Sequence, residues 1–180
     1  MNNKSDLSWI IDPLDGTIPY WYDITDHFSV CIVLAKDKTS FLGVIFAPKR
    51  RELYSAEQNQ GSFCNGKKIN VSREDNINHI LIGLDGGKET VNFKRSNLAI
   101  YEAKLYSPNG VTGILSSCCA SVPLALTAKG NLHAYLALSL EPWDMAVAAV
   151  INREAGAKVT TWILLEFYTQ QNIYSENRKI

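Results

Sequence analysis

The amino-acid sequence predicts a layered α/β fold, in which helices and sheets pack over one hydrophobic core. Short apolar runs rich in β-branched and aromatic residues alternate along the chain with segments that have the pattern of helices. Apolar residues make up 46% of the 180 residues, so the chain can bury a substantial core. This length fits a single domain, or a large share of a fold built from two halves.

Most of the predicted strands are short and are separated by turn residues. Residues 9–11 read as a buried strand that leaves Asp12 at its end. Residues 28–35 and 41–47 are joined by so short a turn that they should form an antiparallel hairpin. Asn65-Gly66 supplies the positive φ angles of a type I′ turn inside a second hairpin. The other predicted strands cover residues 52–56, 79–83, 112–115, 131–137 and 158–161.

The strongest helical pattern covers residues 141–156. Pro142 stands where the first turn of a helix tolerates proline, and Gly156 stands where a helix ends. Nearly every face of this segment is apolar, so we expect it to be buried, with Asp144 in its first turn at the rim of the core. A buried carboxylate needs a partner or a metal.

Two further segments, residues 90–104 and 116–130, have weaker helical patterns. Pro123 falls inside the second of them, where an interior proline costs about 3 kcal/mol. We therefore expect it to kink the helix or to delay its start. Ser116 or Ser117 could cap the same helix.

The residues after the first strand place two carboxylates beside a turn. Asp15 follows Asp12 by three residues, and Gly16 and Thr17 begin a short helical turn with free backbone N–H groups. Oxygen ligands of this kind suit Mg²⁺, which proteins usually share with a substrate phosphate. An ordinary strand-to-turn segment is the alternative, because Asp, Pro and Gly are common in turns. The aromatic cluster that follows Thr17 could form one wall of a pocket or pack against the sheet.

Charge and cysteine content argue against several classes of protein. The 18 basic residues equal the 18 acidic ones and are dispersed, which argues against a nucleic-acid partner. The chain has neither an apolar stretch of 18 residues nor the apolar stretch of a signal peptide, so we expect no membrane partner and a cytoplasmic protein. The cysteine spacings fit no zinc site, and we interpret the four cysteines as reduced thiols.

Two stretches of the sequence resemble the motifs of a known enzyme family. Residues 9–17 and 143–146, followed by Glu154-Ala155-Gly156, are similar to the motifs of the inositol monophosphatase family of Mg²⁺-dependent, Li⁺-sensitive phosphatases. The resemblance covers roughly residues 7–161 and includes the hairpin around Asn65-Gly66. It implies the αβαβα sandwich of inositol monophosphatases and sugar phosphatases, here truncated at its N-terminal side.

The resemblance also implies a domain organisation. We expect a partial phosphatase domain at residues 1–161 and an atypical C-terminal tail at residues 162–180, as in a partial or frameshifted gene product.

The implied site combines a magnesium centre with a phosphate seat. By similarity to the family, the metal ligands are Asp12, the Leu14 carbonyl, Asp15 and Asp144. The backbone amides of Gly16 and Thr17 would hold the phosphate, and Asp144 would also contribute to substrate binding. The Thr17 hydroxyl would orient the attacking water, which makes Thr17 and Asp15 the expected catalytic residues. Mg²⁺ is the implied cofactor, Li⁺ the implied inhibitor, and a small phosphorylated molecule the implied substrate.

The chain departs from the family pattern inside the expected site. The family has a metal-binding Glu upstream of the first Asp, whereas Asp6 is the only acidic residue before Asp12 in this chain. Six extended residues span about 20 Å, so we do not expect Asp6 to reach the ion that Asp12 binds. Ala137 stands where inositol monophosphatases have a Glu that binds the sugar-like ring, and Glu141 is not at the matching place. Residues 118–121, Cys-Cys-Ala-Ser, replace a Gly-Ser-Ala-Ala stretch that lines the pocket, and the larger thiols should narrow it.

These observations lead to two functional hypotheses. The first is a Mg²⁺-dependent phosphomonoesterase that hydrolyses inositol phosphate or a related sugar phosphate with metal-activated water. The alternative is a catalytically impaired relative that binds metal or a partner chain without turnover. The missing N-terminal helices should expose apolar sheet surface that favours association, for instance as a homodimer.

Overall fold

The computed structural model describes residues 7–36, 39–87 and 97–160. Its strands are β1 (Leu7–Asp15), β2 (Ser29–Lys36), β3 (Thr39–Ala47), β4 (Glu52–Glu57), β5 (Gly61–Cys64), β6 (Lys67–Ile69), β7 (Leu81–Asp85), β8 (Gly113–Leu115) and β9 (Ala134–Ala137). Its helices are α1 (Thr17–Tyr22), the 3₁₀ helix η1 (Ile77–His79), α2 (Asn97–Leu105), α3 (Ser121–Ala128) and α4 (Pro142–Glu154).

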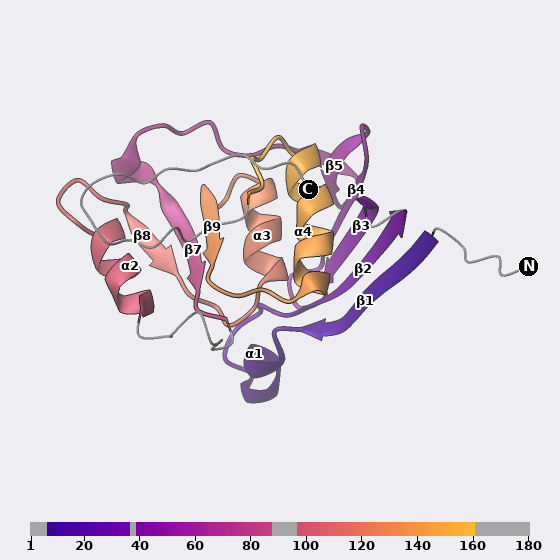
Figure 1. Cartoon of the computed structure of the whole chain (residues 1–180), viewed down its shortest axis with the longest axis horizontal. Helices are drawn as coiled ribbons and strands as arrows, with labels where there is room; N and C mark the ends of the chain where they lie inside the picture. Colours follow the sequence, from indigo (N-terminus) through magenta and orange to yellow (C-terminus); the bar gives the residue numbers. More distant parts are fainter. Residues whose placement is uncertain (1–6, 37–38, 88–96, 161–180) are drawn as a thin grey trace, which may run out of the picture.

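The strands form two sheets with different topologies. Strands β1 to β6 make a six-stranded antiparallel sheet in chain order, whereas β8, β7 and β9 make a three-stranded parallel sheet with β7 in the centre. Figure 1 shows α3 and α4 lying between the two sheets, with α2 on the outer side of the small sheet. The layered α/β class is therefore confirmed, and the described residues form successive α, β, α and β layers.

The main hydrophobic core lies between the six-stranded sheet and the two central helices. Alternate residues of β2 and β3, such as Val33 and Ile45, point toward α4, whose Val147 and Ile151 are fully buried. Gly43 lies where α4 comes so close that an added Cβ would be 2.5 Å from the Val150 side chain. Helix α4 thus packs tightly over the sheet, because its buried face is apolar from Val147 to Ile151.

Strand β1 differs from its prediction as a buried strand. It is the edge strand of the large sheet, and Trp9 and Ile11 are 62% and 57% exposed, while Ile10 packs against the core. The reason is that β1 has a helix on only one of its faces, so its alternate apolar side chains point outward. Asp12 also lies inside β1 and not at its end: it is the last residue of the regular ladder before a register shift that extends to Asp15.

The two predicted hairpins are confirmed. Strands β2 and β3 pair antiparallel, and so do β5 and β6. Asn65 and Gly66 have φ angles of 50° and 75°, as a type I′ turn requires. The helix expected at 141–156 is confirmed as α4, with Pro142 at its start and Gly156 at a φ of 95° just after its end.

Other elements differ from their predictions. The strand expected at 131–137 begins at Ala134. The strand expected at 79–83 begins at Leu81, because residues 77–79 form η1. The helix expected from residue 116 begins at Ser121, so Pro123 falls in its first turn and delays its start, as one of the two alternatives had it. Residues 158–160 carry no strand.

Some expectations lie outside the described residues. They concern Asp6, residues 90–96 of the weak helical segment, and the tail at 162–180. Within the described ranges, none of the helices combines the length and the apolar character that crossing a bilayer requires.

Candidate metal centre

Three carboxylates from two distant regions of the sequence meet at one end of the large sheet. Asp12 and Asp15 come from the second half of β1, and Asp144 comes from the first turn of α4, which packs over β1. One oxygen of each residue lies within 4.8 Å of an oxygen of the other two. The structure therefore brings together all three acidic residues that the sequence nominated.

The position of Asp12 follows from the irregular end of β1. After Asp12 the ladder with β2 shifts register, and the backbone N–H of Leu14 donates to Asp12 Oδ1 over 3.0 Å. Burial raises the pKa of Asp12, the Leu14 N–H partly offsets that rise, and the nearby charge of Asp15 adds to it. Asp12 is thus held by its own turn, with its charge disfavoured by its surroundings.

Asp15 is held from the opposite side by the start of α3. Its Oδ2 accepts the backbone N–H groups of Ala120 and Ser121 over 3.0 and 2.7 Å, the Ser121 hydroxyl, and the Cys119 thiol over 3.1 Å. The Ser121 hydroxyl also lies 2.7 Å from the buried Ser29 hydroxyl of β2. These donors fix the orientation of the carboxylate and link β1, β2 and α3 around it.

Asp144 is the most buried member of the cluster. The residue is only 8% exposed, and its Oδ1 is buried without a hydrogen-bond partner among the residues that the structure describes. Burial raises the pKa of Asp144 to about 7, and repulsion by Asp15 and then Asp12 contributes to that rise.

This arrangement fits a divalent cation. Three carboxylates crowded at one point repel one another, and a cation among them would offset both the repulsion and the unsatisfied oxygen of Asp144. A donor set made of oxygens matches the preference of hard ions such as Mg²⁺.

The turn after Asp15 is tightly packed at Gly16. Gly16 has a φ of 79°, and a Cβ at this position would be 2.4 Å from the His27 carbonyl oxygen and 3.1 Å from Cys119 Cβ. Only glycine fits there, because both the φ and the space exclude a side chain. Thr17 follows as the exposed first residue of α1, where the first N–H groups have no helical acceptor.

A hollow of about 300 Å³ adjoins Thr17 and is lined by the α1 residues Ile18, Trp21 and Tyr22. Trp21 is 79% exposed beside this hollow, whereas Tyr20 makes an edge-to-face contact with Phe28. One part of the aromatic cluster therefore lines the hollow, and another part packs against the chain.

Several site residues were missed or misread from the sequence. Ser116 and Ser117 do not cap α3: the Ser116 hydroxyl and the Ser117 N–H instead donate to Asp85. Asp85 was not among the residues expected at the site, although an acidic residue at the end of an apolar strand was a usable signal. The thiol that points to the site is that of the buried Cys119, while Cys118 is exposed.

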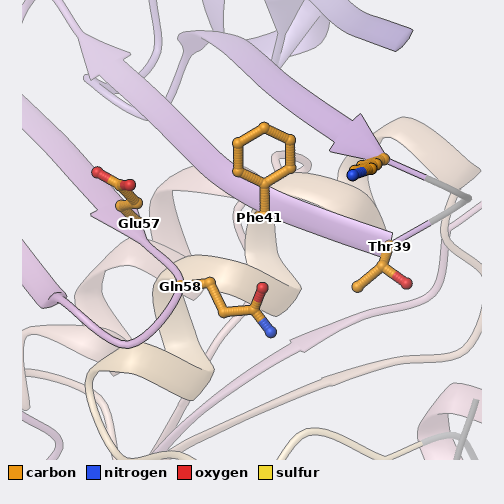
Figure 2. Close-up of a pocket in the computed structure, with 5 residues that line it drawn as sticks. Thr39, Phe41, Glu57 and Gln58 are labelled. Atoms are coloured by element: carbon orange, nitrogen blue, oxygen red, sulfur yellow. The ribbon is translucent and has the colours of Figure 1, made fainter. Parts of the chain in front are cut away.

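A second hollow of about 450 Å³ lies at the other end of the large sheet. Its lining residues come from β2, β3, the end of β4 and the turn after it, and include Phe41, Glu57 and Gln58 (Figure 2). Lys36, which also lines it, pairs with Leu7 at the far end of β1 from the carboxylates. This hollow is therefore separate from the candidate metal centre.

Comparisons with known proteins point to one family. The sequence profile of the inositol monophosphatase family matches residues 1–178. Inositol monophosphatase 1 from Homo sapiens is 35% identical over 153 residues, which cover 83% of this chain and 53% of that protein. The inositol-1-monophosphatase of Rhizobium meliloti is 34% identical over 149 residues, covering 82% of this chain and 54% of that protein.

Solved structures give the same result. An inositol monophosphatase from Anabaena superposes with a TM-score of 0.77 at 29% identity, covering 88% of this chain and 62% of that chain. The chain spans about half the length of the curated relatives described above.

Proposed function

Because the chain belongs to the inositol monophosphatase family, we propose that it is a Mg²⁺-dependent phosphomonoesterase acting on inositol phosphate or a related sugar phosphate. The observation that carries this proposal is the convergence of Asp12, Asp15 and Asp144 within 4.8 Å of one another. Their side chains come from β1 and α4, so folding itself assembles the site.

In this proposal Asp12, Asp15, Asp144 and the Leu14 carbonyl would hold the ion. When bound, Mg²⁺ would neutralise charge on the phosphate and lower the pKa of an attacking water. Asp15 would reach the ion in a fixed orientation, because four donors already hold its Oδ2. Asp144 would give up its proton on loading, because its pKa lies near 7 without the ion.

The turn beside the ion would bind the phosphate. Gly16 allows the backbone to approach closely, and the N–H groups of Gly16 and Thr17 would donate to the phosphate oxygens. The Thr17 hydroxyl is exposed at this turn and would accept or donate a hydrogen bond that orients the water. Asp144 would face the substrate from α4.

The proposal leaves the substrate class broader than inositol phosphate. Ala137 at the end of β9 offers no carboxylate for the hydroxyls of an inositol ring, so ring recognition would come from other groups. A sugar phosphate therefore fits this chain as well as an inositol phosphate does.

Phosphate release in the presence of Mg²⁺ tests the proposal. Purified chain should hydrolyse inositol monophosphate or a sugar phosphate with added Mg²⁺ and should lose that activity in Asp15→Asn and Asp144→Asn. Glu57→Gln is the matched control, since it makes the same chemical change at an exposed position of β4. Equal activity in the unmodified chain and in both site variants would reject the proposal.

A second candidate function rests on the outer face of the large sheet. Trp9 and Ile11 of β1, Phe46 of β3 and Leu53 of β4 are between 42% and 62% exposed, and the strand register puts all four on the same face. We propose that, if turnover is absent, the chain is a metal-binding relative that associates through this face, with a homodimer as the simplest assembly.

Two measurements on one sample separate the candidates. Calorimetric Mg²⁺ binding without phosphate release, together with a concentration-dependent sedimentation coefficient, would favour the second function. Phosphate release by a chain that sediments as a monomer would favour the first.

A further inference from the structure

The loop between β8 and α3 lies between two carboxylates, one from each sheet. Four of the five residues from Ser117 to Ser121 donate their backbone N–H groups to these carboxylates. The N–H groups of Ser117 and Cys118 donate to Asp85 Oδ1 over 3.2 and 3.1 Å. Those of Ala120 and Ser121 donate to Asp15 Oδ2 over 3.0 and 2.7 Å.

Asp85 is the less expected of the two acceptors. It is the last residue of β7, the central strand of the small sheet, and it is only 8% exposed. Besides the two N–H groups, it accepts the Ser116 hydroxyl over 3.2 Å and, at Oδ2, the Tyr135 hydroxyl over 3.1 Å. A buried carboxylate with this many donors is a fixed anchor.

The loop changes direction between its two anchors. Cys118 has a φ of 56°, in the left-handed region that a non-glycine residue rarely adopts. The change redirects the following N–H groups from Asp85 toward Asp15, and the Ser117 hydroxyl braces the turn by donating to the Cys119 carbonyl over 2.9 Å. Such a strained conformation persists only where its surroundings hold it in place.

We propose that Asp85 is a positioning residue for the metal centre: by anchoring the β8–α3 loop, it aims the Ala120 and Ser121 N–H groups at Asp15 and so fixes that cation ligand. Asp85 itself belongs to the other sheet and is not a member of the carboxylate cluster that could hold an ion. The inference rests on the proposed function, because it takes Asp15 to be a ligand of the ion. Outer partners that orient metal ligands typically change metal affinity by 10- to 100-fold when removed.

Amide hydrogen exchange in the metal-free protein tests the mechanical side of the inference. In Asp85→Ala, the amides of Ala120 and Ser121 should exchange about tenfold faster, although neither of them donates to Asp85. Calorimetric titration should show that the same variant binds Mg²⁺ with a dissociation constant about tenfold larger. Should Asp85→Ala fail to fold, Asp85→Asn keeps an acceptor oxygen and should show both effects in the same direction.

Glu154 offers a matched control at the other end of α4. Its carboxylate accepts the backbone N–H groups of Asn59 and Gly61, each over 2.8 Å, and so anchors a loop in the same way but away from the metal centre. Glu154→Ala should speed exchange in its own loop and leave both the Mg²⁺ affinity and the Ala120 and Ser121 amides unchanged.

The outcomes separate this inference from the proposed function. Unchanged exchange at Ala120 and Ser121 in Asp85→Ala or Asp85→Asn would overturn the inference, even if the Mg²⁺ affinity fell, because loss of a nearby negative charge alone would explain that fall. Equal Mg²⁺ affinity in the unmodified chain and in Asp85→Ala would overturn it as well. Absence of any Mg²⁺ binding by the unmodified chain would instead overturn the proposed function, and with it the role of Asp85 toward the ion.

Discussion

Replacing Asp144 by asparagine should stabilise the metal-free protein while removing its response to Mg²⁺. The carboxyl has a pKa of about 7 in the folded chain and an ordinary value of 3.8 when exposed. Below about pH 4 it is protonated in both states and has no effect. As the pH rises from 4 to 7, the unfolded chain gains stability by releasing the proton, whereas the folded chain must retain it, so folding becomes less favourable.

The magnitude follows from this difference. One pKa unit corresponds to about 1.4 kcal/mol, so the full cost of the Asp144 charge above pH 7 is about 4 kcal/mol. Solvent screening and relaxation lower this value, and we expect Asp144→Asn to gain about 2 kcal/mol at pH 8. The neutral amide can also donate to the nearby carboxylates of Asp12 and Asp15.

Thermal unfolding with and without Mg²⁺ measures the effect. In metal-free buffer at pH 8 the Tm of Asp144→Asn should lie about 4–8 °C above that of the unmodified chain, and the difference should shrink to almost nothing at pH 4. Saturating Mg²⁺ should raise the Tm of the unmodified chain and leave that of the variant unchanged. A gain in Tm that persists at pH 4, or no gain in Tm at pH 8, would refute the reasoning. The control Glu57→Gln, at an exposed position, should leave the Tm unchanged at both pH values.

Other predictions concern the sheet, the turn and the thiols. Burial raises the pKa of Glu52 in β4, but hydrogen bonds from Lys129, from Tyr54 of the same strand and from Arg50 of the preceding turn lower it to about 2. Lowering the pH from 4.5 to 2 should therefore remove about 2 kcal/mol of folding stability, and urea titrations of Glu52→Gln should show that this loss is absent. In the same titration, Gly16→Ala should lower the folding stability by about 1–3 kcal/mol more than Gly66→Ala does, because both glycines have a positive φ but only at Gly16 would the added Cβ clash with its neighbours. Equal losses of stability would contradict the close packing around Gly16. Iodoacetamide should modify the exposed Cys118 well before Cys31, whose pKa is raised by burial to about 12, and mass spectrometry showing equal rates would argue against this burial.

Much of the fold was predictable because local chemistry decided it. Proline at the start and glycine at the end of α4 defined that helix, and Asn65-Gly66 defined a hairpin whose turn needs two positive φ angles. The three acidic residues could be nominated for a similar reason: Asp12 and Asp15 stand at a turn, and Asp144 stands in the first turn of an apolar helix.

The rest depended on tertiary arrangement. The sequence of β1 is as apolar as that of a central strand, and only the strand order shows that it is an edge with Trp9 and Ile11 exposed. The contacts around Asp15 could not be foreseen from spacing, because Ser121 lies more than 100 residues after Asp15 and Asp85 belongs to the other sheet. Their roles exist only once the β8–α3 loop passes between the sheets.

The central claim is that Asp12, Asp15 and Asp144 together form a divalent-cation site. Electron paramagnetic resonance of Mn²⁺, used in place of Mg²⁺, counts bound ions directly and does not depend on turnover. The unmodified chain should bind Mn²⁺ saturably, Mg²⁺ should displace it, and Asp15→Asn and Asp144→Asn should each lose the binding while Glu57→Gln keeps it. Binding that survives in both site variants, or that never saturates in the unmodified chain, would contradict the claim.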